Sequence, residues 1–254
     1  MSATQKEKAL LFASLHKPGD PLILFNAWDA GSAKVIAEAG ARAIATGSWS
    51  VAAAQGFADG EAMPLDLVLA NVRRIAAAVD LPVTIDFEGG YAADPAGVAA
   101  NAARLAEAGA IGCNFEDRVV GGDGLHSIEE QSARIAAISN AAGEAFFINA
   151  RTDVFLKSPV EAHGGLIDSA LQRAAAYAEA GARGLFVPGL ADEALIERVC
   201  AASPLPVNIM VWSGTPPLKR LAELGAARIS HAGGPWRIAM KALAQAAEAA
   251  HRGE

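Results

Sequence analysis

Two acidic side chains close together are the first feature of this sequence that could perform chemistry. Residues 84–91 read TIDFEGGY and follow Leu-Pro-Val at 81–83, which predicts a short buried strand that ends in acids. Alternation along a strand would direct Asp86 and Glu88 to the same side. Carboxylates so placed repel each other unless a cation lies between them, and hard oxygen ligands favour Mg²⁺ or Mn²⁺. The pair therefore predicts a divalent metal site, with a solvated acidic loop as the alternative.

Composition narrows the classes of protein that could carry such a site. The 254 residues are 52% hydrophobic, enough for one large core, and we predict a single domain over residues 1–254. A net charge of −7 without a basic run argues against nucleic acid and anionic membranes. No apolar stretch reaches the roughly 18 residues of a membrane span, and the N-terminus lacks a signal-peptide core. Cys113 and Cys200 lack a metal-type spacing, so we expect buried free thiols and a cytoplasmic protein.

One short phrase recurs four times, each time after an Ala-rich helical pattern and before a short apolar run. It reads Glu-Ala-Gly-Ala at 38–41, 107–110 and 179–182, and Glu-Leu-Gly-Ala at 223–226. The glycine is the expected left-handed helix terminator. Repeated helix–glycine–strand units indicate parallel strands joined by helical crossovers.

The whole chain can be divided into eight such units. Strands are expected at 22–28, 43–46, 83–87, 112–116, 146–151, 184–187, 207–211 and 228–231. Helices are expected to begin near Ala30, Leu65, Pro95, Ile128, Gly165, Asp192, Pro216 and Pro235, and an extra N-terminal helix spans 3–16. Eight βα units in about 250 residues predict an α/β fold of the (β/α)₈ TIM barrel type. An open doubly wound sheet is the alternative, disfavoured because no Gly-x-Gly-x-x-Gly element is present.

Local signals support several of these boundaries. Asp94 before Pro95 forms an N-cap pattern, and Ser127 with Glu130 forms a capping box. The long connections 49–64 and 118–126 are expected to be irregular. Both would lie at the C-terminal ends of the strands, where barrel active sites are built, so a gating role is our hypothesis for them.

A barrel would gather the residues after each strand at one mouth. The acids would hold Mg²⁺, an arginine would bind a substrate carboxylate, and a Gly-Ser turn would offer backbone N–H donors. The candidates are Asp29, Gly47, Ser48, Asp86, Glu88, Glu116, Asp117, Arg151, Asp153, Asn208 and His231.

Several segments of the chain resemble the isocitrate lyase/phosphoenolpyruvate mutase family. In the family's order, they are NAWDAGSA at 26–33, ATGS at 45–48, GFADG at 56–60, DFEGGY at 86–91, NFED at 114–117 and NARTD at 149–153. The resemblance covers roughly residues 20 to 210. It implies a (β/α)₈ barrel that assembles as a tetramer or dimer, often exchanging its last helix between neighbours. It also implies Mg²⁺ and a 2-oxo-acid or enolpyruvate-type species.

The resemblance also implies roles for individual acids. Asp86 matches the direct metal ligand. Glu88 and Glu116 match acids that hold the metal largely through its waters. Asp59 matches the acid on a mobile loop after the second strand, and it is a candidate for the catalytic proton transfer.

The substrate side of the site is implied in the same way. Arg151 matches the arginine that binds the substrate carboxylate and takes part in catalysis. Gly47 and Ser48 match the turn that binds the pyruvoyl-like group. Trp49 is expected to form a wall of this substrate-binding pocket.

The other candidates have simpler interpretations. Asp117 could pair with Arg118 or cap a turn, and Asp153 could support the arginine at 151 or the metal. Asp29 is expected to cap the first barrel helix, and His231 is expected to be structural.

The chain departs from the family in the loop after the fourth strand. Lyases carry a Lys-Lys-Cys-Gly-His or Lys-Arg-Cys-Gly-His loop there, and mutases carry a lysine and an asparagine. Here residues 119–124 read VVGGDG, with none of these side chains. Isocitrate or methylisocitrate cleavage and phosphoryl migration are therefore disfavoured, and the shared ability to stabilise an enolate on Mg²⁺ remains.

Four functions are compatible with these residues. The first is a carbon–carbon lyase or decarboxylase that acts on a small 2-oxo- or 2-hydroxy-dicarboxylic acid through a pyruvate-like enolate. The second is P–C bond chemistry, mutase or hydrolase, on a phosphonate such as phosphonopyruvate. The third is a non-catalytic barrel that binds 2-oxo acids. The fourth, a phosphate-binding sugar isomerase, rests on Gly233-Gly234 and leaves the acids unexplained.

Overall fold

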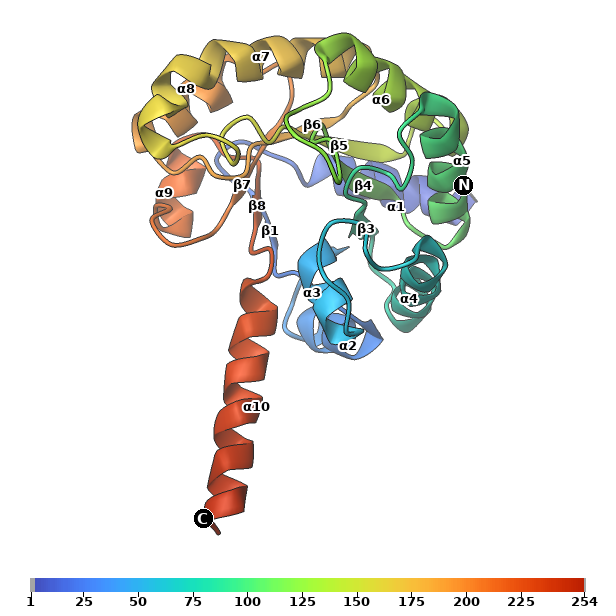
Figure 1. Cartoon of the computed structure of the whole chain (residues 1–254), viewed down its shortest axis with the longest axis vertical. Helices are drawn as coiled ribbons and strands as arrows, with labels where there is room; N and C mark the ends of the chain where they lie inside the picture. Colours follow the sequence, from blue (N-terminus) through green and yellow to red (C-terminus); the bar gives the residue numbers. More distant parts are fainter. Residues whose placement is uncertain (1–2, 254) are drawn as a thin grey trace.

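Eight parallel strands form one sheet that curls into a barrel, as the repeated units predict. The computed structural model describes residues 3–253, and Figure 1 shows the strands at the centre of a ring of helices. The strand order is β1-β8-β7-β6-β5-β4-β3-β2, and a single bridge between Ala27 and Thr46 joins the first two strands. The strands are β1 Leu22–Leu24, β2 Ile44–Ala45, β3 Val83–Asp86, β4 Gly112–Glu116, β5 Phe147–Arg151, β6 Gly184–Phe186, β7 Val207–Met210 and β8 Arg228–Ser230. The fold is a (β/α)₈ TIM barrel.

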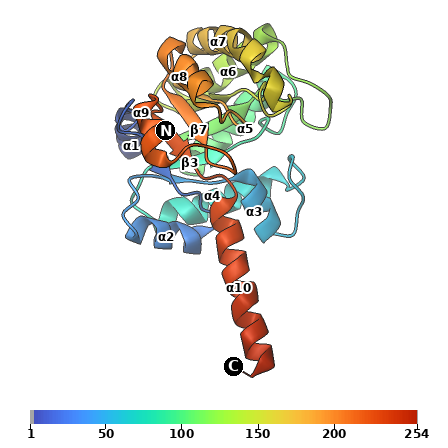
Figure 2. The same cartoon turned by 90° about the vertical axis from the view of Figure 1, so that its left-hand side faces the viewer.

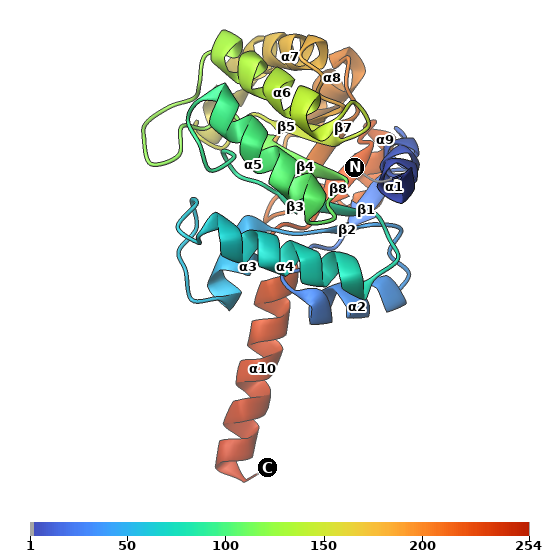
Figure 3. The same cartoon turned by 90° about the vertical axis from the view of Figure 1, so that its right-hand side faces the viewer.

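Helices connect consecutive strands on the outside of the barrel, and Figure 3 shows α4, α5 and α6 side by side there. They are α1 Ala3–Ser14, α2 Ala30–Glu38, α3 Ser48–Ala54, α4 Leu65–Ala78, α5 Pro95–Glu107, α6 Ile128–Ala142, α7 His163–Glu179, α8 Glu193–Ala202, α9 Leu218–Glu223 and α10 Gly234–Arg252, with a short 3₁₀ turn η1 Val160–Ala162. Four of the eight expected barrel helices begin at the predicted residue, and the other four begin within two residues of it. Among the described residues, no helix is both long and apolar enough to cross a membrane.

The local signals act as predicted. Asp94 accepts a hydrogen bond from the backbone of Gly97, and Ser127 forms a reciprocal capping box with Glu130. The four repeated glycines follow α2, α5, α7 and α9 with positive φ angles between 93° and 109°. This left-handed conformation ends each helix and turns the chain toward the next strand.

Three expectations were wrong in detail. The first strand ends at Leu24 instead of residue 28, because only Ala27 pairs again with the neighbouring strand. The connection 49–64 is not irregular throughout, since its first part is helix α3, in which Val51 and Ala52 are buried. Cys113 is a buried free thiol as expected, but Cys200 is free and only partly buried.

The barrel interior has two layers. The lower layer, toward the N-terminal ends of the strands, is apolar, and the upper layer, toward their C-terminal ends, is polar. The lower layer contains Leu22, Leu24, Ala43, Ala45, Ile111 and Phe147, and Phe12 of α1 closes it at the N-terminal ends of the strands. Above it, the fully buried Arg228 donates hydrogen bonds to Ser230 and to Asn114, which also accepts from Asn149. The polar layer therefore underlies the mouth where the candidate site residues lie.

Candidate active site

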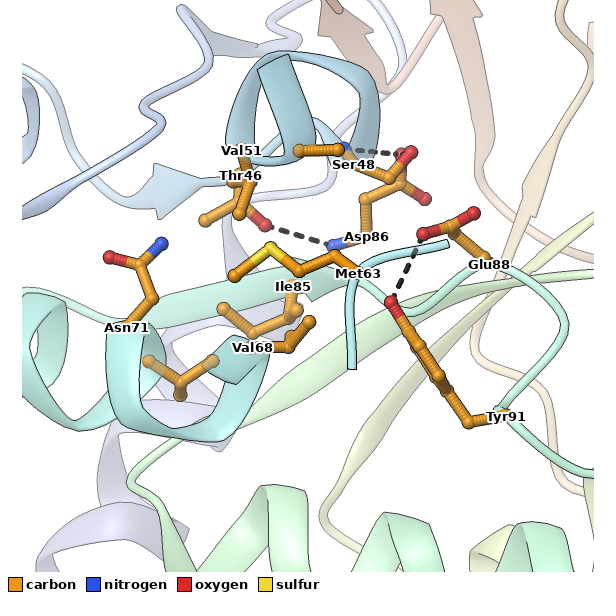
Figure 4. A pocket seen from close by; sticks show the side chains of 12 residues that line it. Thr46, Ser48, Val51, Met63, Val68, Asn71, Ile85, Asp86, Glu88 and Tyr91 are labelled. Carbon is orange, nitrogen blue, oxygen red and sulfur yellow. Dashed lines mark hydrogen bonds between the residues drawn. The ribbon is translucent and has the colours of Figure 1, made fainter. Parts of the chain in front are cut away.

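Strands β3, β4 and β5 end in charged residues that lie side by side at the mouth. Asp86 is the last residue of β3, and Glu116 pairs in register with Arg151 at the ends of β4 and β5. Ser48 begins α3 beside them, and Figure 4 shows its contact with Asp86. The structure thus brings residues together that are more than a hundred positions apart, as barrel closure predicts.

One carboxylate oxygen of Asp86 is held and the other is free. Oδ2 accepts hydrogen bonds from the backbone N–H of Ser48 at 3.1 Å and from its hydroxyl at 2.9 Å. The Asp86 N–H donates to Oγ1 of Thr46, which fixes the backbone. Oδ1 is buried and has no hydrogen-bond partner. A buried, unpaired carboxylate oxygen is costly unless a cation or a water binds it.

Glu88 is fastened from two sides. Its Oε1 accepts from the Tyr91 hydroxyl at 3.1 Å, and its Oε2 accepts from the Glu61 N–H at 2.7 Å. Burial, followed by repulsion from Asp86, raises the pKa of Glu88 to about 7. Burial also raises the pKa of Glu116 to about 8, although Arg151 opposes the shift. Both carboxyl groups therefore hold their protons more strongly than an exposed glutamate does.

Arg151 bridges two carboxylates. Its Nε and Nη2 donate to the two oxygens of Asp153 at 2.6 and 2.9 Å, and its Nη1 lies 2.9 Å from Oε2 of Glu116. Burial alone would lower the pKa of Arg151, but Glu116 and Asp153 raise it above its usual range. The structure confirms that Asp153 is a partner of Arg151, and the bidentate contact fixes the guanidinium plane at the mouth.

Asp117 has a different environment from either one expected. It neither pairs with Arg118 nor caps a turn; its oxygens accept from the N–H of Asp153, from Arg173 and from the Tyr177 hydroxyl. Its side chain is fully buried. Asp117 therefore anchors the segment that follows β5 to α7 and orients Asp153.

The remaining predicted residues surround the cluster. Asp59 lies in the loop after α3, with Oδ1 3.4 Å from the Ser48 hydroxyl, and partial burial of the carboxyl and the Asp86 charge raise its pKa. Gly47 is the N-cap residue of α3. Trp49 is partly exposed, and the guanidinium of Arg237 lies 4.8 Å from its ring centre, which places the indole at the start of α10.

The last two candidates, Asp29 and His231, make structural contacts. Asp29 caps α2 through the backbone of Ser32. The His231 ring lies 3.3 Å from the carbonyl of Leu24, and burial lowers its pKa.

Sequence reasoning missed Glu61, which contacts both Glu88 and Tyr91. Its Oε1 accepts from the Tyr91 N–H at 2.8 Å. All three residues have positive φ angles, 60° for Glu61, 51° for Glu88 and 56° for Tyr91, which is uncommon for residues other than glycine. The sequence does not signal these positive φ angles, because glutamate and tyrosine rarely adopt the left-handed conformation and no residue pattern marks it.

A small hole separates the acids from α4. It has a volume of about 10 Å³, and Figure 4 shows apolar side chains of Met63, Val68 and Ile85 on one side and Asp86 and Glu88 on the other. This is room for about one water molecule and not for a substrate.

The donor set fits one hydrated divalent cation. No group of three His, Cys, Asp or Glu side chains in residues 3–253 is close enough to hold a metal by itself. Mg²⁺ does not require one, because it keeps several waters and binds through one or two carboxylates. A cation bound here would give the unpaired Oδ1 of Asp86 a partner and would lower the raised pKa values of Glu88 and Glu116.

Without metal, this cluster is expected to lower the stability of the protein as the pH rises from about 5 to about 8. The folded-state pKa values of Glu88 and Glu116, about 7 and about 8, lie above the unfolded value of about 4.3. Between these limits the folded state binds more protons than the unfolded state, so raising the pH favours unfolding. Urea unfolding in EDTA at both pH values, for wild type and Glu116→Gln, measures this. A wild type that loses no more stability than the variant would contradict it.

Several known proteins are similar to this chain in sequence and in fold. The family model described as phosphoenolpyruvate phosphomutase matches residues 12–251. The 2-methylisocitrate lyase of Escherichia coli is 32% identical over 256 residues, which cover 92% of this chain and 83% of the lyase.

Two crystal structures extend the comparison. A candidate phosphonomutase from Burkholderia cenocepacia superposes with a TM-score of 0.93 at 53% identity and covers 98% of this chain and 100% of its own. The complex of phosphonopyruvate hydrolase with oxalate and Mg²⁺ superposes with a TM-score of 0.84, covering 100% of this chain and 88% of the hydrolase. At 23% identity, the second likeness shows a shared fold.

Proposed function

Because the chain belongs to the phosphoenolpyruvate mutase/isocitrate lyase family, we propose that it is a Mg²⁺-dependent carbon–carbon lyase or decarboxylase. Its substrate would be a small 2-oxo- or 2-hydroxy-dicarboxylic acid that is cleaved to a pyruvate-like enolate. The observation that carries this proposal is the unpaired Oδ1 of Asp86 in an acid cluster beside the Arg151 guanidinium.

The chain's own side chains would do most of the positioning. Asp86 would bind the metal directly, and Glu88 and Glu116 would hold its waters. The metal, when bound, supplies positive charge for the developing enolate oxygen. Arg151 would bind the substrate carboxylate, with Asp153 keeping the guanidinium plane fixed.

Two further elements complete the proposed site. The Gly47–Ser48 turn would bind the pyruvoyl-like group, although the Ser48 N–H presently donates to Asp86 and would have to be shared. Asp59 would take or give the proton, since its raised pKa lets its carboxyl hold a proton closer to neutral pH.

The loop after β4 lacks the side chains associated with isocitrate cleavage and with phosphoryl migration, so we propose neither reaction. Residues 118–126 form a loop that is closed by an isolated bridge between Arg118 and Leu125 and by a hydrogen bond from the Val119 N–H to the Gly124 carbonyl. It contains no cysteine, lysine or asparagine at 119–124. P–C bond cleavage of a phosphonate stays the second candidate, because the candidate phosphonomutase is 53% identical.

A substrate panel distinguishes the two. The purified protein with Mg²⁺ is incubated with 2-oxo- and 2-hydroxy-dicarboxylic acids, and the products are identified by mass spectrometry. In parallel, phosphate release from phosphonopyruvate is measured. Formation of a 2-oxo monoacid without phosphate release supports the lyase or decarboxylase, and phosphate release alone would replace it by P–C chemistry.

We also propose that the protein forms a homo-oligomer by exchanging α10. This helix projects away from the barrel in Figures 1 and 2, and Pro235 is its one buried residue. Ile238 and Leu243 are 64% and 61% exposed. The last helix of a barrel normally covers the first strand, yet Ile23 and Phe25 face a hollow of about 420 Å³. The α10 of a second copy would fill this hollow. It would bury the apolar side chains of α10 together with those that line the hollow.

The double variant Ile238→Glu/Leu243→Glu is therefore expected to be monomeric, because the charges would have to be buried in the partner's hollow. Light scattering after gel filtration measures the mass. Lys241→Glu on the polar side of α10 is the control and should assemble as wild type does. A wild-type mass of one chain, or unchanged assembly of the double variant, would contradict the exchange.

A further inference from the structure

Glu61 joins the loop after α3 to the loop after β3 with both its backbone and its side chain. Its N–H donates to Oε2 of Glu88 at 2.7 Å, and its own Oε1 accepts from the Tyr91 N–H at 2.8 Å. The Tyr91 hydroxyl in turn donates to Oε1 of Glu88 at 3.1 Å, the contact drawn in Figure 4. These three bonds form a closed ring between two loops that lie 27 to 30 residues apart in sequence.

The backbone of this ring is strained. Glu61, Glu88 and Tyr91 are three of the four described non-glycine residues with positive φ. Such conformations persist only where surrounding contacts over-determine them, and they concentrate at functional sites. Their concentration in one hydrogen-bonded ring indicates that the ring holds both loops in a conformation neither would adopt alone.

Gly89 provides the space for the Glu61 carboxylate. A Cβ at this position would lie 3.1 Å from Oε1 of Glu61 and 2.7 Å from Cγ2 of Val120. The φ of Gly89 is not in the left-handed region, so the close approach of its neighbours is what restricts this position. The missing side chain at Gly89 thus leaves room for the Glu61 carboxylate.

The position of Asp59 depends on the same ring. Asp59 lies two residues before Glu61, and its own polar contact toward the cluster is the long one, 3.4 Å, with the Ser48 hydroxyl. That hydroxyl is closer to Asp86, at 2.9 Å. Of these two acids, Glu61 therefore makes the shorter polar contacts to the neighbouring loop, at 2.7 and 2.8 Å.

From this geometry we infer that Glu61 is a positioning residue that fastens the 55–64 loop over the acid cluster and fixes the orientation of the Glu88 carboxylate. The part of this inference that concerns catalysis rests on the proposed function. The part that concerns the loop stands on the contacts alone.

The test compares Glu61→Ala and Glu61→Gln with wild type and with Glu107→Ala, an exposed glutamate on α5. Hydrogen–deuterium exchange of the full-length, ligand-free protein is measured over residues 55–64. In Glu61→Ala, exchange of this loop should be about tenfold faster while the barrel strands stay protected. Glu61→Gln keeps an oxygen for the Tyr91 N–H and should lie between the two. Equal exchange in Glu61→Ala and Glu107→Ala would overturn the inference.

A second readout separates positioning from mere stability. With Mg²⁺ present, the Kd for oxalate should be about tenfold weaker in Glu61→Ala than in wild type, with partial rescue in Glu61→Gln. The melting temperature without ligand should stay within a few degrees of wild type. Unchanged oxalate affinity in Glu61→Ala would overturn the positioning role. If oxalate binds none of the variants, the proposed function fails, and the exchange result still decides the loop contact.

Discussion

Replacing Asp86 by alanine is expected to abolish turnover and Mg²⁺-dependent oxalate binding. Asp86 is the one acid of the cluster with a buried oxygen free to meet a cation, and its other oxygen is fixed by Ser48. Removing a single contact to the developing charge typically costs about 10²–10³-fold in rate. Loss of the direct ligand should exceed this, because the metal would leave as well. Turnover is measured on whichever substrate the panel identifies.

Asp86→Asn separates this effect from folding. The amide can still accept from Ser48, but it lacks the charge that raises the pKa values of Glu88, Glu116 and Asp59. Because repulsion of the neighbouring acids and attraction to Arg151 and Arg228 are lost together, the metal-free Asn variant should unfold at a urea concentration close to that of wild type. An Asn variant with near-normal turnover would refute the assignment of the site.

Replacing Arg151 by methionine is expected to destabilise the protein by about 3–5 kcal/mol. The guanidinium contacts both Glu116 and Asp153, whose side chains are 6% and 1% exposed, and its removal leaves both buried carboxyl groups without that partner. The same change removes the proposed ligand of the substrate carboxylate, so turnover should be lost. Urea unfolding at pH 7 measures the stability.

Arg151→Lys is the matched control. It keeps the charge but cannot form the fork that grips both oxygens of Asp153. Stability should fall less than in the methionine variant, whereas turnover should still fall strongly because the geometry is lost. A methionine variant that loses less than about 1 kcal/mol would show that the bridge behaves like an exposed ion pair.

Much of the fold could be predicted because its signals are local. The four glycines after the Ala-rich helices impose left-handed turns whatever the rest of the chain does, and Asp94 and Ser127 cap their helices with neighbouring residues. Helix α3 escaped prediction because it is short and follows a glycine. The first strand was overestimated because pairing of residues 25–28 depends on a neighbour far away in sequence.

The sequence predicted which strand-end residues would lie together, but it did not predict their hydrogen-bond partners. Strand ends in a barrel must converge, so Asp86, Glu116 and Arg151 could be brought together from their positions alone. The contact between Asp117 and Tyr177 spans 60 residues and depends on which face α7 presents. The strained ring around Glu61 depends on two loops whose shapes no short pattern encodes.

Thermal unfolding with Mg²⁺, with and without oxalate, which resembles the pyruvate enolate, tests the proposed metal site at Asp86. A ligand at 100 times its Kd should stabilise the folded state by about 2.7 kcal/mol. We expect a rise in melting temperature that requires both Mg²⁺ and oxalate and that is absent in Asp86→Ala. No shift at saturating oxalate, or an equal shift in the Asp86 variant, would contradict an enolate-binding metal site at the end of β3.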